Sequence, residues 1–382
     1  MRRGNGRPAE RRAVTYALRT AAGSRVVVRG DRLVSPRTPV DHVVALGGGV
    51  LLPGLINAHD HLQLNHYPRL GNPPYGNAYQ WGRDIHRRHA TEIRRAGALP
   101  RRDALLFGAL KNLLGGATTV VHHEPWHPTL DRAFPVRVAR VRVAHSLGFE
   151  RDLDGALAGD RESRARPFSM HLAEGIDRVA GREVSECERR GLLRRDLLAV
   201  HLVAADAEDA RRLRRAGAAI VWCPTSNQFL FGRTARQELF AWGPDLLMGT
   251  DSLLTATGTL LDELRAARQL GYVSPRRLRD AVSITAACRL GLPAPNLRSG
   301  SPADLVFLRQ PLFRARPRDV ALVIVAGKPR LGDAQFRHLF AHCGVRTQRL
   351  QVGGMDKLVA APLATIARRA VALTPQAGRI LQ

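Results

Sequence analysis

The sequence predicts an α/β fold: a TIM-like (β/α)8 barrel, distorted around its fourth strand, with a small β-sandwich domain built from both chain ends. Three observations predict this fold. Short, almost continuous apolar segments alternate with helical patterns over residues 53–299, which is typical of a parallel sheet buried on both faces. That region is close to the roughly 250 residues of such a barrel. Short strand patterns broken by glycine lie on both sides of it.

We expect the chain to divide into four parts. They are a basic tail over 1–12, a small β-sandwich domain over 13–52 and 300–345, the barrel over 53–299, and a C-terminal extension over 346–382. Strands of the small domain are predicted at 25–29, 42–46, 303–308 and 320–326. The extension is expected to be irregular after Val345 and then helical around 362–373.

The barrel strands are assigned to the short apolar runs. We predict them at 51–57, 117–122, 136–144, 168–172, 197–203, 218–223 and 245–249. Helices are predicted between them at, among other places, 102–114, 207–216, 260–270 and 275–290. Residues 146–167 are too few to hold a full helix, strand and helix before the strand at 168–172. The fourth strand of the barrel is therefore expected to be absent or rudimentary.

The formal net charge of +26 raises the question of nucleic-acid binding. Lysine occurs only at positions 111, 328 and 357, so arginine makes up the rest of the 59 basic residues. The arginines are spread along the chain and accompany no recognisable nucleic-acid motif. We attribute the excess to codon bias, and expect a small-molecule substrate rather than a nucleic-acid partner. An anionic substrate stays open.

Nothing in the sequence predicts a membrane protein. No apolar run reaches the roughly 18–20 residues of a membrane helix. The basic N-terminal stretch is not followed by the apolar segment of a signal peptide. The four cysteines are scattered, which indicates reduced thiols rather than a disulfide or zinc framework. We therefore expect a cytoplasmic protein without a membrane partner.

The clearest chemical signal is the sequence Pro-Gly-Leu-Ile-Asn-Ala-His-Asp-His over residues 53–61. Residues two apart in a strand point to the same face, so His59 and His61 share one side of a buried strand end. In a barrel, the carboxyl ends of the strands carry the active site. Two imidazoles placed in this way favour a divalent metal, whereas an isolated pair could also be two surface histidines.

Polar residues also follow three later strands. His171 ends one strand and Glu174 lies just beyond it, His201 lies in an apolar strand, and Asp251 follows the last one. Taken alone, a histidine such as His201 is more often a core residue, and a Gly-Thr-Asp sequence is more often a turn or a helix cap. As a set they are expected to converge, because each follows a separate strand of the same barrel.

These motifs, in this order, resemble the amidohydrolase superfamily, in particular its branch of aromatic-ring deaminases and chlorohydrolases. The resemblance spans nearly the whole chain and includes Trp222-Cys-Pro-Thr-Ser-Asn227, similar to the family's segment after strand seven. It implies one divalent metal ion, zinc or alternatively iron, held by His59, His61, His171 and Asp251. It also implies a homo-oligomer and hydrolysis of a non-peptide C–N bond by metal-activated water.

The resemblance further implies catalytic roles for three residues. Asp251 would take a proton from the water and could pass it to the leaving group. His201 would polarise the group under attack or stabilise the developing charge. Glu174 would protonate a ring nitrogen of the substrate and so make the ring carbon electrophilic.

Substrate contacts are expected in the segments that follow the strands. Trp81 lies in the long segment after the first strand and could stack on a planar ring, although packing within the segment explains it equally well. His122 and His123 lie at the end of the second strand, where barrel enzymes contact their substrates. Asn227 follows the seventh strand and would help to shape the pocket.

The predicted function is therefore deamination of a nitrogen heterocycle. Hydrolysis of a cyclic amide, or dehalogenation of a ring by the same site, is the alternative within enzymes. A catalytically silent binding protein is the alternative from a different class, and the intact set of candidate catalytic residues argues against it.

Overall fold

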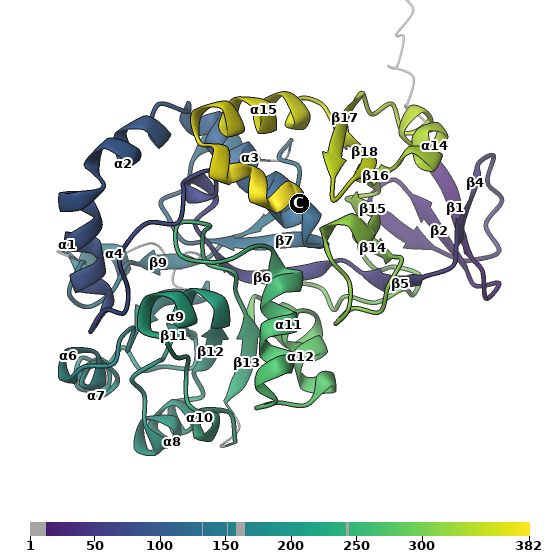
Figure 1. The fold of residues 1–382 in the computed structure, drawn as a ribbon. Coiled ribbons are helices and arrows are strands. Elements are labelled where there is room, and N and C mark those ends of the chain that lie inside the picture. Colours follow the sequence, from purple (N-terminus) through teal and green to yellow (C-terminus); the bar gives the residue numbers. More distant parts are fainter. Residues whose placement is uncertain (1–12, 132, 151, 158–164, 242–243) are drawn as a thin grey trace, which may run out of the picture.

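A computed structural model describes residues 13–131, 133–150, 152–157, 165–241 and 244–382 of the chain (Figure 1). The expected basic tail over residues 1–12 lies outside the described residues. No helix within the described residues is both long and apolar enough to span a bilayer.

In the described part of the chain, eight parallel strands carry the candidate site. They are β6 (Leu55–Asp60), β7 (Ala117–His122), β8 (Arg137–Ala139), β9 (Arg142–Ala144), β10 (Phe168–Leu172), β11 (Leu197–His201), β12 (Ala219–Trp222) and β13 (Asp245–Met248). They form two sheets, with strand orders β6–β7–β8 and β13–β12–β11–β10–β9. Within the described residues, no ladder joins these sheets into one closed barrel. The ends of β6 and β13 are instead linked by the amides of Thr250 and Asp251, which donate to the carbonyl of His59 at 2.9 and 3.1 Å.

The predicted strand at 136–144 is one bent segment that serves both sheets. Its first half, β8, pairs with β7, and its second half, β9, pairs with β10. Only Arg140 and Val141 separate the two halves, so no helix lies between the third and fourth strand positions. This bend accounts for the short spacing that the sequence shows before β10.

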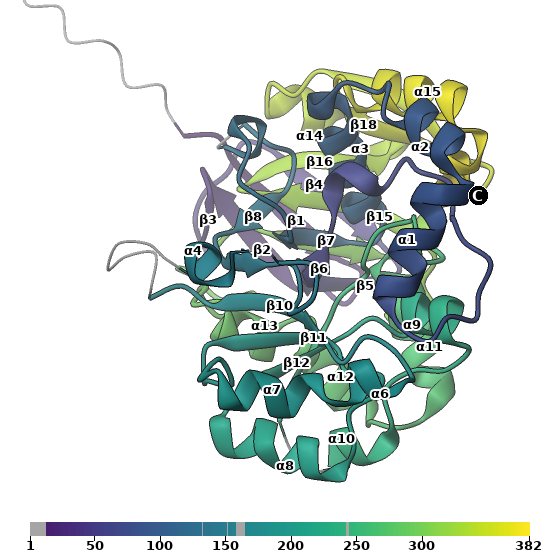
Figure 2. The same cartoon turned by 90° about the vertical axis from the view of Figure 1, so that its left-hand side faces the viewer.

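Helices follow most of the strands (Figure 2). Those of the barrel region are α1 (Ala78–Arg88), α2 (Ala90–Ala96), α3 (Arg101–Leu114), α4 (Leu153–Leu157), α6 (Arg178–Gly181), α7 (Glu183–Arg189), α8 (Ala207–Ala216), α9 (Pro224–Phe231), α10 (Gln237–Ala241), α11 (Leu260–Leu270), α12 (Pro275–Ala281) and α13 (Ile284–Arg289). The helix predicted at 275–290 is divided into α12 and α13. The Ser283 hydroxyl donates to the carbonyl of Arg279 at 2.6 Å, which competes with the helical hydrogen bonds at that point.

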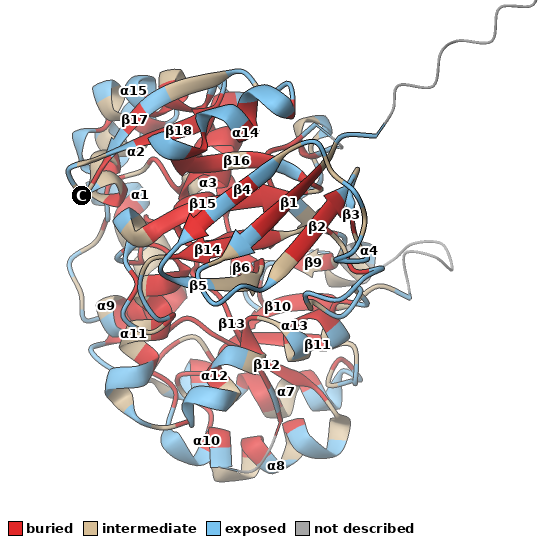
Figure 3. Ribbon diagram, turned by 90° about the vertical axis from the view of Figure 1, so that its right-hand side faces the viewer, coloured by how far each residue is buried: buried red, intermediate tan, exposed pale blue. Residues whose placement is uncertain are grey.

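Two further sheets are built from both ends of the chain (Figure 3). One has the order β3–β2–β1–β4, from β1 (Thr15–Thr20), β2 (Arg25–Arg29), β3 (Arg32–Val34) and β4 (Val43–Gly47). The other has the order β17–β18–β16–β15–β14–β5, from β5 (Val50–Pro53), β14 (Leu305–Leu308), β15 (Val320–Val325), β16 (Lys328–Asp333), β17 (Thr347–Val352) and β18 (Met355–Ala360). Tyr16 and Val28 of the first share one apolar cluster with Phe307 and Ile324 of the second.

The extension after Val345 is not irregular, which corrects the sequence prediction. Strands β17 and β18 form an antiparallel hairpin that continues the six-stranded sheet. Gly353 and Gly354 join them with positive φ angles of 53° and 77°, which suit the two-residue turn of a hairpin. The chain then continues into α15 (Leu363–Leu373), close to the predicted helix, while α14 (Arg337–His342) precedes the hairpin.

Candidate metal centre

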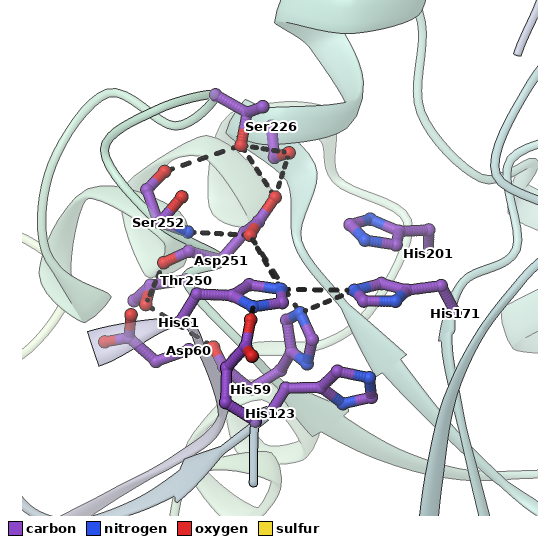
Figure 4. A network of polar contacts seen from close by, with 12 residues as sticks. His59, Asp60, His61, His123, His171, His201, Ser226, Thr250, Asp251 and Ser252 are labelled. Carbon is purple, nitrogen blue, oxygen red and sulfur yellow. Dashed lines mark hydrogen bonds and ion pairs between the residues drawn. The ribbon is translucent and has the colours of Figure 1, made fainter. Parts of the chain in front are cut away.

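Imidazole and carboxylate groups converge at the carboxyl ends of the parallel strands (Figure 4). His59 lies in β6 and His61 directly follows it, His171 lies in β10, His201 in β11, and Asp251 follows β13. The Nε2 atom of His171 lies 3.2 Å from Nε2 of His59 and 3.3 Å from Nε2 of His61. Asp251 Oδ1 lies 3.7 Å from His61 Nε2 and 4.0 Å from His59 Nε2. The structure thus brings the four predicted ligands together.

The hydrogen bonds of the histidines show that this donor set fits a metal ion. The Nδ1–H of His171 donates to the main-chain carbonyl of His145 at 2.6 Å, and Nδ1 of His61 lies 3.2 Å from Glu124 Oε1. A ring nitrogen that donates in this way leaves a lone pair on Nε2, and these lone pairs point at one another in the centre. Burial, and to a lesser extent the charges of neighbouring histidines, hold the pKa values of His59 and His171 well below the usual range. Both rings are therefore neutral and able to act as ligands.

Hydrogen bonds to both carboxylate oxygens hold the Asp251 side chain in place. Oδ2 accepts from the hydroxyls of Ser226 and Thr255, each at 2.7 Å, and Oδ1 accepts from the amide of Ser252 at 2.7 Å. Although burial raises the pKa of Asp251, the charges of His61 and His201 and the two hydroxyls lower it below its usual value. The carboxylate is therefore ionised and oriented toward the histidines.

The backbone at the site is held in unfavourable conformations. His201 and Asp251 have φ angles of 76° and 52°, a region that residues with a side chain adopt rarely. Gly249 allows the close approach that this geometry needs, because a Cβ atom there would lie 2.7 Å from the Cβ of His59. Strain of this kind is typical of functional sites.

Glu174 lies beside the cluster without belonging to it. Its Oε1 is 3.5 Å from His201 Nε2, and it belongs to neither of the two groups of converging ligand atoms. Burial, followed by the charge of Asp251, raises the pKa of Glu174 well above its usual value, which favours the protonated carboxyl group. On the far side of the ring, Nδ1 of His201 lies 2.8 Å from Asn227 Oδ1.

A buried polar network beneath the centre was not predicted from the sequence. Lys111 Nζ donates to the carbonyl of Asp251 at 2.6 Å and to the Thr250 hydroxyl at 2.8 Å, and it lies 3.4 Å from Asp60 Oδ2. Asp60 also accepts from the side-chain amide of Asn112 at 2.7 Å. The network ties α3 and the end of β6 to the loop that carries Asp251.

The candidate substrate contacts occupy different positions. His123 packs against the candidate metal ligands, with its ring centroid 4.3 Å from that of His171, and it contacts Ser169 Oγ at 3.1 Å. His122 accepts from the amide of Leu62 at 3.3 Å. Trp81 lines an apolar pocket next to the centre. A role in substrate binding stays a prediction for these residues and for Asn227, which contacts His201.

The C-terminal segment also reaches the site. The guanidinium group of Arg379 donates to the carbonyl of Leu253 and, at 3.3 Å, to that of Ala256. Both carbonyls belong to the loop that follows Asp251 and contains Thr255. Nothing in the sequence pattern indicated this contact, because it joins positions more than 120 residues apart.

Comparison with known proteins supports the resemblance seen in the sequence. Residues 168–330 match the amidohydrolase family. A 5-methylthioadenosine/S-adenosylhomocysteine deaminase of Pyrococcus furiosus is 27% identical over 208 residues, which cover 44% of this chain and 48% of that protein. An aminodeoxyfutalosine deaminase of Deinococcus radiodurans is 36% identical over 104 residues, or 26% of this chain and 25% of that protein. The chain therefore spans about half the length, or less, of these curated relatives.

Solved structures show that the fold is TIM-barrel-like. An adenosine deaminase from Xanthomonas campestris with bound zinc has a TM-score of 0.65 and 16% identity, covering 95% of this chain and 98% of that chain. Atrazine chlorohydrolase from Arthrobacter aurescens TC1, complexed with zinc, has a TM-score of 0.67 and 17% identity. The match covers 94% of this chain and 100% of that chain. These likenesses show the fold, and the matching segment together with the curated deaminases supports the resemblance to the amidohydrolase superfamily.

Proposed function

We propose that this chain, whose residues 168–330 match the amidohydrolase family, is a metal-dependent hydrolase that removes an amino group from a nitrogen heterocycle. The observation that carries this proposal is the position of Glu174, a buried carboxyl group 3.5 Å from His201 Nε2 and outside the converging ligand set. A deaminase needs such a proton donor beside the water-activating centre. The relatives named as deaminases support the same reaction class.

The proposed metal is one zinc ion per chain, with iron as the alternative. His59, His61, His171 and Asp251 would hold it, since imidazole nitrogens and carboxylate oxygens are usual ligands of zinc. A divalent metal there would supply Lewis-acid activation of water. The zinc named in the two structural neighbours supports this choice.

Three side chains would have separate roles in proton transfer and charge stabilisation. Asp251, ionised and held by Ser226 and Thr255, would accept the proton of the attacking water. Glu174, neutral at the start, would donate its proton to a ring nitrogen and so make the adjacent ring carbon electrophilic. His201, oriented by Asn227, would stabilise the charge that develops on the substrate.

A direct test is ammonia release from a panel of aminopurine nucleosides, pterins, pyrimidines and triazines by zinc-loaded protein. The proposal expects release of ammonia from at least one ring class. Chloride release from a chlorinated ring, or opening of a cyclic amide without ammonia release from any amino-substituted ring, would instead establish the alternative hydrolases. Ligand binding without turnover would establish a silent binding protein. We also propose a cytoplasmic location, which the four free cysteines support.

A further inference from the structure

An apolar pocket of about 590 Å³ lies next to the candidate metal centre, at α1 and α2. Its walls include six apolar or aromatic side chains: Leu64, Tyr67, Trp81, Ile93, Phe149 and Leu254. These residues come from four separate segments of the chain. Such a concave, mostly apolar site with few polar groups is typical of small-molecule binding.

The pocket adjoins the candidate metal centre. Leu64 lies three residues after His61, and Leu254 lies three residues after Asp251. His145 forms part of the wall, and its ring centroid lies 4.9 Å from that of His171 and 5.0 Å from that of Phe149. One imidazole ring therefore contacts both the candidate ligands and the pocket, which places the pocket within reach of a substituent on a molecule bound at the centre.

The walls are built to contact apolar groups. The indole Nε1–H of Trp81 already donates to the carbonyl of Leu70 at 3.0 Å, so the ring presents its apolar surface to the pocket. Ile85 and Leu254 belong to one apolar cluster with Trp81 and Ile93. Arg83 and His86 are exposed, and the nitrogen Nδ1 of His86 lies 2.7 Å from the carbonyl of Gly82.

The wall formed by Phe149 is fixed by close packing. A Cβ atom on Gly82 would lie 2.9 Å from the Phe149 ring, so α1 contacts this ring directly. Phe149 also packs edge-to-face against Tyr79, at 4.8 Å between ring centroids. Phe149 is therefore placed against α1 by these contacts, and its ring offers an apolar surface that suits a flat or branched apolar group.

We propose that the pocket holds an apolar substituent, alkyl or aryl, that the substrate carries in addition to its reacting ring. The inference rests on the proposed function, because it takes the heterocycle to be at the metal centre. It narrows the substrate class from nitrogen heterocycles in general to those with an apolar arm. A substrate whose arm is charged or a bare hydroxyl would leave these walls without matching contacts.

The test compares matched ligand pairs in binding, so that it does not depend on turnover. The pairs are adenosine with 5′-benzylthioadenosine, and 2,4-diamino-1,3,5-triazine with its 6-benzyl derivative. Binding is measured by calorimetry on zinc-loaded Glu174→Gln protein, in which turnover is expected to be slow, and the absence of ammonia release during the titration is checked. Burial of a benzyl group should tighten binding by roughly 10-fold or more in at least one pair.

Substitutions that fill the pocket provide the structural control. Ile93→Phe should reduce the preference for the benzyl ligand, and Ile93→Trp should reduce it further, because each places a larger ring in the part of the pocket that the benzyl group would occupy. The matched Ile284→Trp variant, at an exposed position on α13, should keep the preference. The proposal is overturned if neither pair shows a benzyl preference, or if the preference survives both Ile93 variants. Ammonia release by wild-type protein decides the proposed function separately.

Discussion

The ammonium group of Lys111 lies 2.6 Å from the main-chain carbonyl oxygen of Asp251. This contact joins α3 to the loop after β13, at the place where no strand ladder connects β13 with β6. Lys111 is fully buried, and the carboxylate of Asp60 lies 3.4 Å from it. One buried cation therefore helps to set the distance between Asp251 and the two histidines of β6.

Replacing Lys111 tests this arrangement. Lys111→Met should lower the free energy of unfolding by about 3–5 kcal/mol, because it leaves the Asp60 carboxylate buried without its cation. It should also weaken metal binding by roughly 10–100-fold, because the support of a ligand is lost. Both quantities can be measured by denaturant unfolding and by competition with a metal chelator.

Lys357 supplies a matched control for that substitution. It is equally buried and lies 2.6 Å from Asp333 Oδ1, but in the sheet built from the chain ends. Lys357→Met should destabilise the protein and leave the metal affinity unchanged. Equal metal affinities of the two variants would contradict a positioning role for Lys111.

Glu174→Gln distinguishes a deaminase from a simple hydrolase. Glutamine keeps the size and hydrogen bonding of the side chain but cannot donate a proton to a ring nitrogen. Turnover should fall by about 10²–10⁴-fold while the fold and metal content persist. His171→Ala should instead lose metal and activity together. Near-normal deamination by Glu174→Gln would refute the proton-donor role.

The raised pKa of Glu263 leads us to expect that the free energy of unfolding depends on pH. Glu263 is fully buried and accepts from the amide of Thr225 at 2.9 Å, and burial raises its pKa to about 8. When folding raises the pKa of an acid, the folded protein is most stable below the pKa that the acid has in the unfolded chain. Stability then falls as the pH rises toward and through the pKa in the folded state. Between pH 5 and 8 this carboxyl group should therefore cost roughly 3–4 kcal/mol of stability.

Glu263→Gln should remove most of this dependence. The difference in unfolding free energy between wild type and variant, followed by urea denaturation from pH 5 to 8.5, should shift in favour of the variant as pH rises. Taking the difference cancels the titration of all other groups that the two proteins share. A difference that stays constant with pH would show that Glu263 does not titrate in this range.

The contacts of Arg379 with the loop after Asp251 lead us to expect that the C-terminal segment contributes to activity. Arg379→Gln removes the donors to the carbonyls of Leu253 and Ala256 and should loosen the loop that presents Thr255 to Asp251. We expect turnover to fall by roughly 10-fold, about 1.4 kcal/mol of activation free energy, with metal content retained. Arg368→Gln, at an exposed position on α15, should keep wild-type turnover. Equal effects of the two substitutions would argue against this role.

The convergence of the candidate ligands could be predicted because it follows from local patterns. His59 lies at the end of a buried strand and His61 just after it, and Asp251 lies three residues beyond the end of another such strand, so the parallel fold brings them to one edge. The motifs with His171, His201 and Asp251 lie in the segment that matches the amidohydrolase family.

The supporting residues could not be predicted in the same way. Lys111 lies in a helix whose pattern reveals a buried face but not that Nζ reaches Asp251. The partner of His171 is a main-chain carbonyl, which carries no sequence signal. The hairpin of β17 and β18 was missed because its strands contain several polar residues, although Gly353-Gly354 is a hairpin signal.

The most direct test of the proposed metal centre is the metal content of the purified protein by elemental analysis, with and without His59 and His61. We expect about one divalent transition metal per chain in the wild type, and its loss together with hydrolytic activity in His59→Ala/His61→Ala. Retained folding of that variant, shown by circular dichroism, makes the comparison valid. A wild-type protein that acts on its substrate without bound metal, or a variant with unchanged metal content, would contradict a metal-dependent site at these residues.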